Sequence, residues 1–539
     1  MKCLKLLVLL PILLNACRPS STEVGELPNR PNILFAISDD QSFAHTSFAG
    51  AGFVNTPAFD QIAKNGVYFR NCLSGSPGCA PSRSAIVTGR YHWQNEQSGQ
   101  HASGWLKKYV PFVDLLTANG YYTGYTGKGV GPFKYGEIDS LREENAAGKA
   151  YSSIRYQEGT EEDERFGKFI NAINYAANFE DFLSRREVGK PFFFWYGATE
   201  PHRAYQEGIG LERGKKLEDV EVPAFFPDVA TIRSDLLDYA VEIEWFDLHL
   251  QRMLEHLESI GELENTVVIV TSDNGMPFPR AKANGYEYGI HVPFAVSFPK
   301  AFPPGRQVDD LISFVDLAPT ILELTGTSSE GMLPISGKSF MDVLTSEQEG
   351  LVDASRQYAF NGRERHSSSR YRNLGYPQRM IRDGRYLLTW NQRPARWPAG
   401  APQRLDPEGD GALLPMYGLD ENGIHHSEWA FTDVDACPAK SYLVEHSDND
   451  SIRYYFDLAY AKRPEFEFFD IQNDPACLNN LSGNPEYRET ERRLKEALVA
   501  KLKATGDPRA VGPNTEIFDT YTRYSPIRDF PEPDWYIKN

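Results

Sequence analysis

Short apolar runs alternate with amphipathic helical patterns from residue 30 to about residue 345. The clearest runs cover residues 32–37 (NILFAI), 121–126, 191–196 (PFFFWY) and 267–271 (VVIVT). Most of them lack a polar face, which is typical of strands buried on both sides. A helical pattern with an apolar stripe begins near Ser234 and ends at Gly261. This alternation predicts an α/β domain over residues 30–345, built on a mostly parallel sheet flanked by helices.

The pattern changes after about residue 350, where Pro, Gly, Arg and aromatic residues become frequent. Residues 386–390 and 466–469 have the composition of isolated strands, and residues 488–505 form an amphipathic helical pattern. We therefore expect a smaller C-terminal α+β domain over residues 346–539, containing an antiparallel sheet and long loops.

The N-terminus has the pattern of an export signal. Lys2 and Lys5 precede an apolar stretch at residues 6–14, which is too short to span a bilayer as a helix. Residues 14–17 (LNAC) resemble a bacterial lipobox, which predicts a signal peptide over residues 1–16, lipidation of Cys17 and a tether over residues 17–29. Acyl chains would then anchor an exported protein, periplasmic or at the outer membrane, to a membrane surface. The alternative is an ordinary cleaved signal with an incidental cysteine.

Charge and cysteine content narrow the classes of partner. The net charge of −18 argues against nucleic acid. Of six cysteines, Cys72, Cys437 and Cys477 have no role assigned by a motif. An exported protein can form disulfides, and Cys437–Cys477 is the pair to test first, although the sequence leaves its formation open.

Polar residues directly follow four of the expected strands. In open α/β sheets, ligands bind outside the carboxyl ends of the strands, so these residues are expected along one edge. Taken singly, each has the alternative reading of a turn residue. Three carboxylates and one amide oxygen among them form a hard-oxygen set that suits calcium or magnesium. The residues are Asp39, Asp40, Lys128, His202, Asp273 and Asn274.

Residues 79–90 read CAPSRSAIVTGR, the most specific motif in the chain. Pro81 suits the first turn of a helix, where its missing N–H needs no partner. Cys79 would then lie at the positive end of the helix dipole and close to Arg83, and both favour an anion in front of the thiol. A structural cysteine at a helix start is the alternative.

Together these motifs resemble the formylglycine-dependent sulfatases, type I, of the alkaline-phosphatase-like superfamily. The resemblance implies that a formylglycine-generating or anaerobic sulfatase-maturating enzyme oxidises Cys79 to an aldehyde. The hydrated aldehyde would attack the sulfur of a sulfate ester, and the resulting hemiacetal sulfate would collapse to release sulfate. It also implies one Ca²⁺ per chain, bound by Asp39, Asp40, Asp273, Asn274 and the modified Cys79.

The resemblance assigns roles to the basic residues as well. Arg83 would steady the hydrated aldehyde, His202 would contact sulfate or protonate the leaving oxygen, and Lys282 would place a cation on the sulfate. Lys128 matches a glycine–lysine motif that usually has a histidine two places later. That position is Val130 here, which puts the second basic group of this loop in doubt.

The segments at residues 276–279 (MPFP) and 468–471 (FFDI) are closest to the N-sulfoglucosamine sulfohydrolase-like bacterial glycan sulfatases. Seven arginines lie between Arg363 and Arg385 in an otherwise acidic chain, and an arginine fork suits carboxylates and sulfates. This segment could line the mouth of the site and bind a uronate or a second sulfate, or it could form only surface salt bridges. The candidate substrate-binding residues are His101, Arg363, His366, Arg370 and Arg379.

The sequence thus predicts a hydrolase that removes sulfate, as ester or as sulfamate, from sulfated polysaccharides or oligosaccharides in bacterial glycan degradation. One alternative is a phosphodiesterase or phosphonate monoester hydrolase of the same superfamily. An alternative of another class is an inactive surface lipoprotein that binds glycan. The complete set of Cys79, Arg83 and carboxylates argues against the last.

Overall fold

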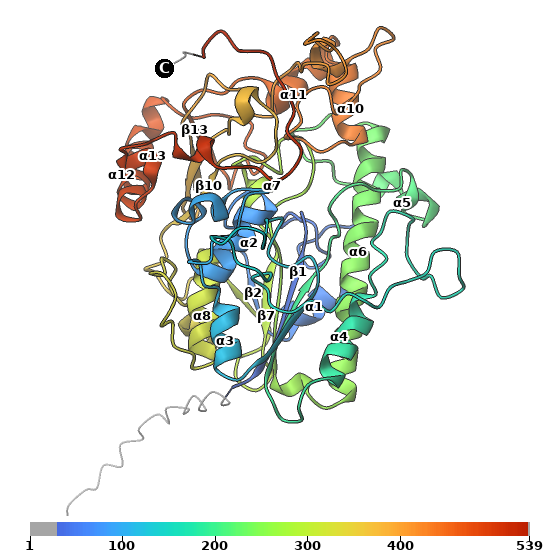
Figure 1. Ribbon diagram of the computed structural model, residues 1–539, viewed down its shortest axis with the longest axis vertical. Coiled ribbons are helices and arrows are strands. Elements are labelled where there is room, and N and C mark those ends of the chain that lie inside the picture. The colour runs from blue at the N-terminus through green and yellow to red at the C-terminus, as the bar shows by residue number, and fades with distance from the viewer. Residues whose placement is uncertain (1–29, 537–539) are drawn as a thin grey trace, which may run out of the picture.

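The computed structural model describes residues 30–536 and has a lower α/β half and an upper C-terminal half (Figure 1). Among these residues, no helix combines the length and apolar character needed to cross a bilayer. The signal peptide, Cys17 and the tether over residues 17–29 lie outside the described part of the chain.

The lower half is built on a seven-stranded sheet with the order β4-β5-β1-β6-β7-β2-β8. Strands β4, β5, β1 and β6 are mutually parallel, β7 runs antiparallel to both β6 and β2, and β8 is parallel to β2. The expected mostly parallel sheet is therefore confirmed. In chain order the strands are β1 (Asn32–Ser38), β2 (Val67–Phe69), β4 (Tyr122–Gly127), β5 (Phe192–Gly197), β6 (Thr266–Ser272), β7 (Phe294–Ser297) and β8 (Arg306–Val308).

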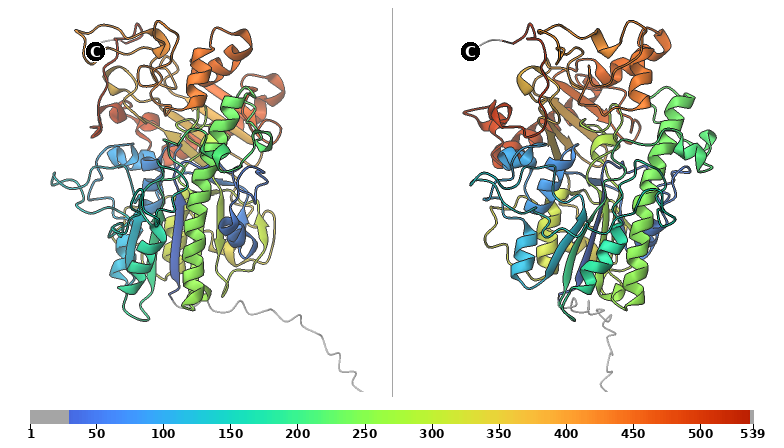
Figure 2. Two further views of the ribbon diagram at one scale, coloured as in Figure 1. Left: turned by 90° about the vertical axis from the view of Figure 1, so that its right-hand side faces the viewer. Right: turned by 45° about the vertical axis from the view of Figure 1, so that its right-hand side comes forward.

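Helices cover both faces of this sheet because alternate side chains of each strand point to opposite faces. Ile33, Phe35 and Ile37 of β1 pack in one apolar cluster, whereas Leu34 and Ala36 pack in another. The first cluster lies under α2, α3 and α8, and the second under α1, α4 and α6 (Figure 2). These helices are α1 (Pro57–Lys64), α2 (Cys79–Thr88), α3 (Phe112–Ala118), α4 (Tyr175–Ser184), α6 (Ala230–Ser259) and α8 (Leu317–Leu324).

The C-terminal half contains the expected antiparallel sheet, in the order β10-β11-β12-β13. The strands β12 (Tyr386–Asn391) and β13 (Phe466–Asp470) match the predicted runs, as does the helix α12 (Arg488–Ala504). Strand β11 (Gln378–Arg382) lies inside the arginine-rich segment, β10 (Ala359–Arg363) ends where that segment begins, and neither was predicted. The polar residues in both strands, NGR at the end of β10 and two arginines in β11, obscure the apolar alternation that marks a half-buried strand.

This small sheet is fixed between α12 and the α/β half. Ile381, Leu388 and Phe468 face Leu494 and Leu498 of α12. The opposite face packs on the lower half around α7 (Glu287–Ile290). The remaining elements are β3 (Cys72–Leu73), β9 (Ile312–Ser313), α5 (Ile209–Glu212), α9 (Met341–Thr345), α10 (Pro438–Glu445), α11 (Asp450–Tyr460) and α13 (Pro508–Val511).

The central strands point their carboxyl ends toward the C-terminal half (Figure 1). The link is direct, since the hydroxyl of Ser76, just before α2, donates to the carbonyl of Gly362 on β10 at 2.8 Å. The sheet edge that carries the predicted polar residues is therefore covered by the smaller sheet and its loops.

The suggested disulfide between Cys437 and Cys477 is not formed, because both thiols are free and buried. Cys437 precedes α10, and its sulfur accepts a hydrogen bond from the backbone N–H of Lys440 at 3.3 Å. Cys477 packs in a separate apolar cluster with Ile290 and Phe469. Packing in two different clusters keeps the thiols apart, which the sequence spacing alone did not indicate.

Candidate active site

The predicted carboxylates meet because their strands are neighbours in register. Ser38 at the end of β1 pairs with Ser272 at the end of β6, so Asp39 and Asp273 leave the sheet side by side. The backbone N–H of Asp40 donates to Asp273 Oδ1 at 3.1 Å. The amide of Asn274 donates to Asp40 Oδ1 at 2.7 Å. All four residues are buried.

Cys79 is the first residue of α2, and the helix is held against the end of β6. The hydroxyl of Ser82 donates to the carbonyl of Asp273 at 2.6 Å and accepts from the N–H of Gly75 at 3.0 Å. The Cys79 sulfur and one oxygen each of Asp39 and Asp273 lie within 4.8 Å of one another. Burial raises the pKa of the Cys79 thiol to about 11, so an unmodified thiol stays protonated at neutral pH and is a poor nucleophile.

Arg83 lies one turn further along α2 and is fully buried. Its Nε donates to Asp273 Oδ2 at 2.7 Å, and its Nη1 donates to the carbonyls of Lys128 and Gly129. Its Nη2 has no partner within the described residues. Arg83 thus joins the ends of β4 and β6 and keeps one donor free.

Two lysines approach the cluster from opposite sides. The ammonium of Lys128, which follows β4, forms an ion pair with Asp39. Lys282 Nζ lies 2.6 Å from Asp40 Oδ2 and 2.9 Å from Asp435 Oδ2. Burial alone would lower the pKa of both ammonium groups, but these carboxylates raise it. Both lysines therefore stay cationic at neutral pH.

The pKa values of two buried carboxyl groups are shifted in opposite directions. Burial acts to raise the pKa of Asp39, but the basic groups of Lys128, His202, Arg83 and Lys282 hold it well below its usual range. Burial, followed by the negative charge of Asp39, raises the pKa of Asp273 to about 7. Two carboxylates this close are more stable with an added cation between them.

His202, in the loop after β5, presents a free ring nitrogen to this edge. Its Nδ1–H donates to the carbonyl of Arg203 at 2.7 Å, and its Nε2 lies 3.9 Å from Asp40 Oδ2. The side chain is 36% exposed and lines a cavity of about 310 Å³ together with Asp39 and Lys128. A group in this cavity can therefore reach Nε2.

Two buried oxygens of the cluster lack a hydrogen-bond partner among residues 30–536, namely Asp39 Oδ1 and Asn274 Oδ1. Buried polar atoms are rarely left unpaired, so both are free to bind a cation. With the carboxylates of Asp40 and Asp273, they make a set of hard oxygen donors of the kind that Ca²⁺ and Mg²⁺ prefer. The residues present therefore fit a divalent metal.

The two predicted substrate-binding histidines lie beside the nucleophile position. A Cβ added to Gly78 would lie 3.1 Å from His366 Nδ1, which places this ring next to the start of α2. The ring centroids of His101 and His366 are 4.8 Å apart. Burial lowers the pKa of His366 to about 3 and that of His101 well below its usual value, so both rings are neutral near pH 7.

Asp435 belongs to the site but was missed from the sequence. It lies in the loop before α10 and pairs with Lys282, and its carboxylate also lies within 4.8 Å of ligand atoms of Asp40 and His202. It follows no strand and has no motif around it, so no sequence signal could have identified it. Val130, in contrast, is fully buried in the core beside Trp105, which explains why this position carries no basic group.

The arginines do not form the exposed mouth suggested by the sequence. Arg363 and Arg370 are buried and share the carboxylate of Asp433, at 2.5 and 2.6 Å. Arg363 retains two nitrogens, Nε and Nη1, with no partner in the described chain. Arg379 is fully buried and pairs with Glu364 and Asp507.

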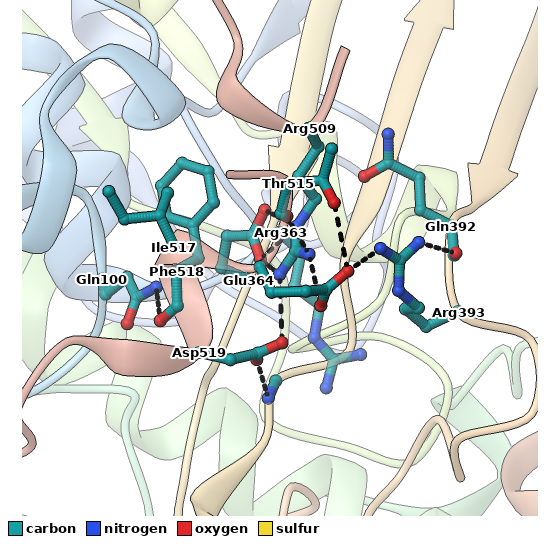
Figure 3. A network of polar contacts seen from close by, with 12 residues as sticks. Gln100, Arg363, Glu364, Gln392, Arg393, Arg509, Thr515, Ile517, Phe518 and Asp519 are labelled. Atoms are coloured by element: carbon teal, nitrogen blue, oxygen red, sulfur yellow. Dashed lines mark hydrogen bonds and ion pairs between the residues drawn. The ribbon is translucent and has the colours of Figure 1, made fainter. Parts of the chain in front are cut away.

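Glu364 is shared with Arg509 in the same interior network (Figure 3). Every nitrogen of the Arg379 guanidinium donates to this network or to a backbone carbonyl, so it has no free donor for a sugar.

Comparison with known proteins identifies the family of the chain. The pattern of the family described as Sulfatase matches residues 31–327, and that of N-sulphoglucosamine sulphohydrolase, C-terminal, matches residues 281–391. An ulvan-active sulfatase of Formosa agariphila is 26% identical over 89% of this chain and 76% of its own length. Human N-sulphoglucosamine sulphohydrolase is 24% identical over 93% of this chain and 95% of its own length.

Solved structures show the same fold. A protein crystallised with its substrate D-glucosamine-2-N,6-O-disulfate aligns with a TM-score of 0.59 and 19% identity, over 91% of this chain and 99% of that one. A putative sulfatase from Bacteroides fragilis aligns with a TM-score of 0.59 and 18% identity, over 90% and 97% of the two chains. The first family pattern alone spans more than half of the sequence, and the chain therefore belongs to the sulfatase family.

Proposed function

We propose that this sulfatase removes sulfate from a sulfated oligosaccharide or polysaccharide, as ester or as sulfamate, in bacterial glycan degradation, with formylglycine made from Cys79 as nucleophile. The observation that carries the proposal is the meeting of Cys79, four basic residues and an unpartnered oxygen set at one sheet edge. Relatives described as ulvan-active and N-sulphoglucosamine sulphohydrolases support a glycan substrate.

The basic residues can bind the three peripheral oxygens of a sulfate in front of residue 79. Arg83 has a free Nη2, and the ammonium groups of Lys128 and Lys282 lie on either side of the carboxylates. Donors already fixed by ion pairs need no reorganisation as charge develops on the sulfate. Formylglycine would supply a hydrated aldehyde, whose second hydroxyl allows the sulfate to be expelled.

His202 would protonate the leaving atom. Its Nδ1–H is held by the Arg203 carbonyl, so Nε2 is the nitrogen that exchanges a proton with the substrate. A proton on the bridging oxygen or nitrogen makes the departing sugar a better leaving group.

Asp39, Asp40, Asp273 and Asn274 would hold one Ca²⁺ next to residue 79. When bound, the ion favours the ionised nucleophile and withdraws charge from a sulfate oxygen. The unpartnered Asp39 Oδ1 and Asn274 Oδ1 support this assignment.

Substrate contacts and cellular location are further parts of the proposal. His101, His366 and Arg363 have unpartnered nitrogens or lie beside residue 79, so they are the candidates for contacts with the sulfated sugar. The sequence of residues 1–17 supports export and a lipid anchor at Cys17, which would place the enzyme in the periplasm or at the outer membrane.

The decisive experiment is to co-express the chain with a maturating enzyme and to assay sulfate release from sulfated oligosaccharides and from an aryl sulfate. Mass spectrometry of the peptide containing residue 79 should show the aldehyde, and Cys79→Ala should release no sulfate. Activity of fully unmodified thiol protein would refute the nucleophile. Faster turnover of phosphate diesters or phosphonate monoesters than of any sulfate would refute the substrate class.

A further inference from the structure

The cavity at His202 continues into a second, larger one. The first, of about 310 Å³, is lined near the catalytic edge by Asp39, Lys128 and His202. The second, of about 820 Å³, lies between α6 and α10 and is lined by Tyr205, Tyr442 and others. Both are lined by Phe169, Arg203 and Ala204, so they adjoin and form one groove that leads away from the leaving-group side of the site.

The walls of this groove are acidic, and we call it the acidic groove. Its lysine and arginine each pair with a carboxylate, Lys128 with Asp39, and Arg203 through Nη1 with Asp235 at 2.7 Å, while Nη2 of Arg203 has no partner among the described residues. Arg203 is also enclosed by the rings of Tyr205 and Phe278, each 4.3 Å from its guanidinium carbon. The carboxyl groups beyond these two pairs are those of Glu200, Glu207, Asp238, Glu242 and Glu445.

Two of these carboxyl groups are fully occupied by the protein. Glu200 accepts from the N–H of Asn171 and from the hydroxyl of Tyr175, both at 2.8 Å. Asp238 accepts from the N–H groups of Gly208 and Gly210, at 2.9 and 2.8 Å. They shape the wall and offer little further hydrogen bonding.

Glu242 differs because its carboxyl group has no partner. It lies on α6, is 3% exposed and lines the same cavity as His202. Within residues 30–536 it makes no hydrogen bond or ion pair. Its oxygens are not among the fully enclosed atoms without a partner, so they open onto the cavity, where a ligand can supply the missing hydrogen bond.

The state of this group suits a hydroxyl or an amine. Burial, followed by the charges of Glu200 and Asp238, raises the pKa of Glu242 well above its usual value. In its neutral form the group can both donate to and accept from a hydroxyl. In its ionised form it would pair with an ammonium group.

We propose that the acidic groove binds one sugar residue of the substrate, on the leaving-group side, and that this sugar carries no anionic group. Glu242 contacts a hydroxyl or ammonium group of that sugar directly. This inference rests on the proposed function, because it takes His202 as the acid that faces the leaving group. A uronate or a second sulfate in the groove would lie near the carboxyl groups of Glu207, Glu242 and Glu445, and the negative charge of those that are ionised selects against it.

The test compares three converted proteins, wild type, Glu242→Leu and Glu242→Gln, on matched substrates. The oligosaccharides share one sulfated sugar and differ only in the sugar on the leaving-group side, which is neutral, amino-substituted or a uronic acid. An aryl sulfate, which has no such sugar, reports the catalytic centre. Wild type should have at least tenfold higher kcat/KM for the neutral or the amino substrate than for the uronate, and the better of these two identifies hydroxyl or ammonium.

Glu242→Leu should lower kcat/KM on the preferred oligosaccharide at least tenfold more than on the aryl sulfate. If the preferred sugar offers a hydroxyl group, Glu242→Gln should retain most of the wild-type kcat/KM, because an amide can still hydrogen-bond to a hydroxyl. An equal loss on both substrates, or no loss, would overturn the role of Glu242. A preference for the uronate in wild type would overturn the charge argument. Failure of wild type to release sulfate from any substrate would instead refute the proposed function.

A matched pair of charge reversals tests the groove without touching catalytic groups. Glu207 is exposed on the groove wall, and Glu258 is exposed near the opposite end of α6. Glu207→Lys should reduce the ratio of kcat/KM between the preferred substrate and the uronate substrate, most clearly at low salt. Glu258→Lys should leave this ratio unchanged. The same effect from both variants would show a response to net charge rather than to the groove.

Discussion

Two buried, charge-rich regions of this protein differ in whether their polar atoms have partners. At the sheet edge, Asp39 and Asn274 keep buried oxygens, and Arg83 a nitrogen, that have no partner within residues 30–536. In the interior of the C-terminal half, the charges of Arg379, Glu364 and Asp507 are paired with one another and none is exposed by more than 1%. The first region therefore keeps polar atoms that can bind a ligand, whereas the charged groups of the second bind one another and stabilise the fold.

The difference shows that a high density of charge does not identify a site. Removing one partner of a buried pair leaves an uncompensated charge, so a saturated network should affect stability. A cluster with unpartnered atoms should affect ligand binding and turnover.

The largest effect is expected at the nucleophile. Cys79→Ala should abolish sulfate release, a loss of more than about a thousandfold, because no other side chain replaces the attacking group. Its melting temperature should stay close to that of wild type, since only one small side chain is trimmed. A large drop in melting temperature would place Cys79 with the structural residues.

The next effect concerns the metal cluster. Asp39→Asn should lower kcat/KM by at least about a hundredfold and reduce bound calcium measured by elemental analysis. Added Ca²⁺ should raise the melting temperature of wild type, because a ligand that binds only the folded state stabilises it, but not that of Asp39→Asn. Full calcium occupancy in the variant would contradict the assignment.

The saturated network should respond in stability. Asp507→Asn removes the charge that faces Arg379 in a fully buried pair, so it should lower the free energy of unfolding by about 3–5 kcal/mol in urea titrations. At a temperature where the variant stays folded, kcat/KM on an aryl sulfate should change less than threefold. A pure activity loss at unchanged stability would return Arg379 to the substrate-binding residues.

A pH effect should come from the pair between Glu287 and Arg382, 2.9 Å apart. Burial opposes ionisation of Glu287, but Arg382 and His291 lower its pKa from 4.5 to about 2. A lowered carboxyl pKa contributes stability above pH 4.5, and the contribution is lost as the pH falls from 4.5 to 2, here about 3 kcal/mol. Glu287→Gln should flatten this slope in urea titrations across that pH range, whereas an unchanged slope would exclude the pair as its source.

The smallest effect is expected for an exposed pair in the C-terminal half. Arg453 and Asp457 are 3.0 Å apart on α11 and about half exposed. Arg453→Ala should change the free energy of unfolding by less than about 0.5 kcal/mol, because solvent screens such pairs. A larger loss would mean that its packing on Phe456, and not its charge, is what matters.

The sequence by itself determined the sheet and which residues lie along its carboxyl edge. Strand periodicity is local, and parallel strands place the residues that follow them at one edge, which is where Asp39 and Asp273 were expected. That β1 and β6 are neighbours in register, which brings the two side chains together, came from the tertiary structure. The motif at Cys79 and the apolar runs of β12 and β13 could also be recognised in the sequence, because each is a local pattern.

Only the tertiary structure decided how distant charges pair. Asp433 lies 70 residues from Arg363, and Asp507 lies 128 residues from Arg379. No local pattern links such partners, and the packing of the C-terminal half on the sheet edge brings them together. The same packing added Asp435 to the site, kept Cys437 apart from Cys477 and left Glu242 facing a cavity, because each depends on which surfaces meet and not on the neighbouring residues in the chain.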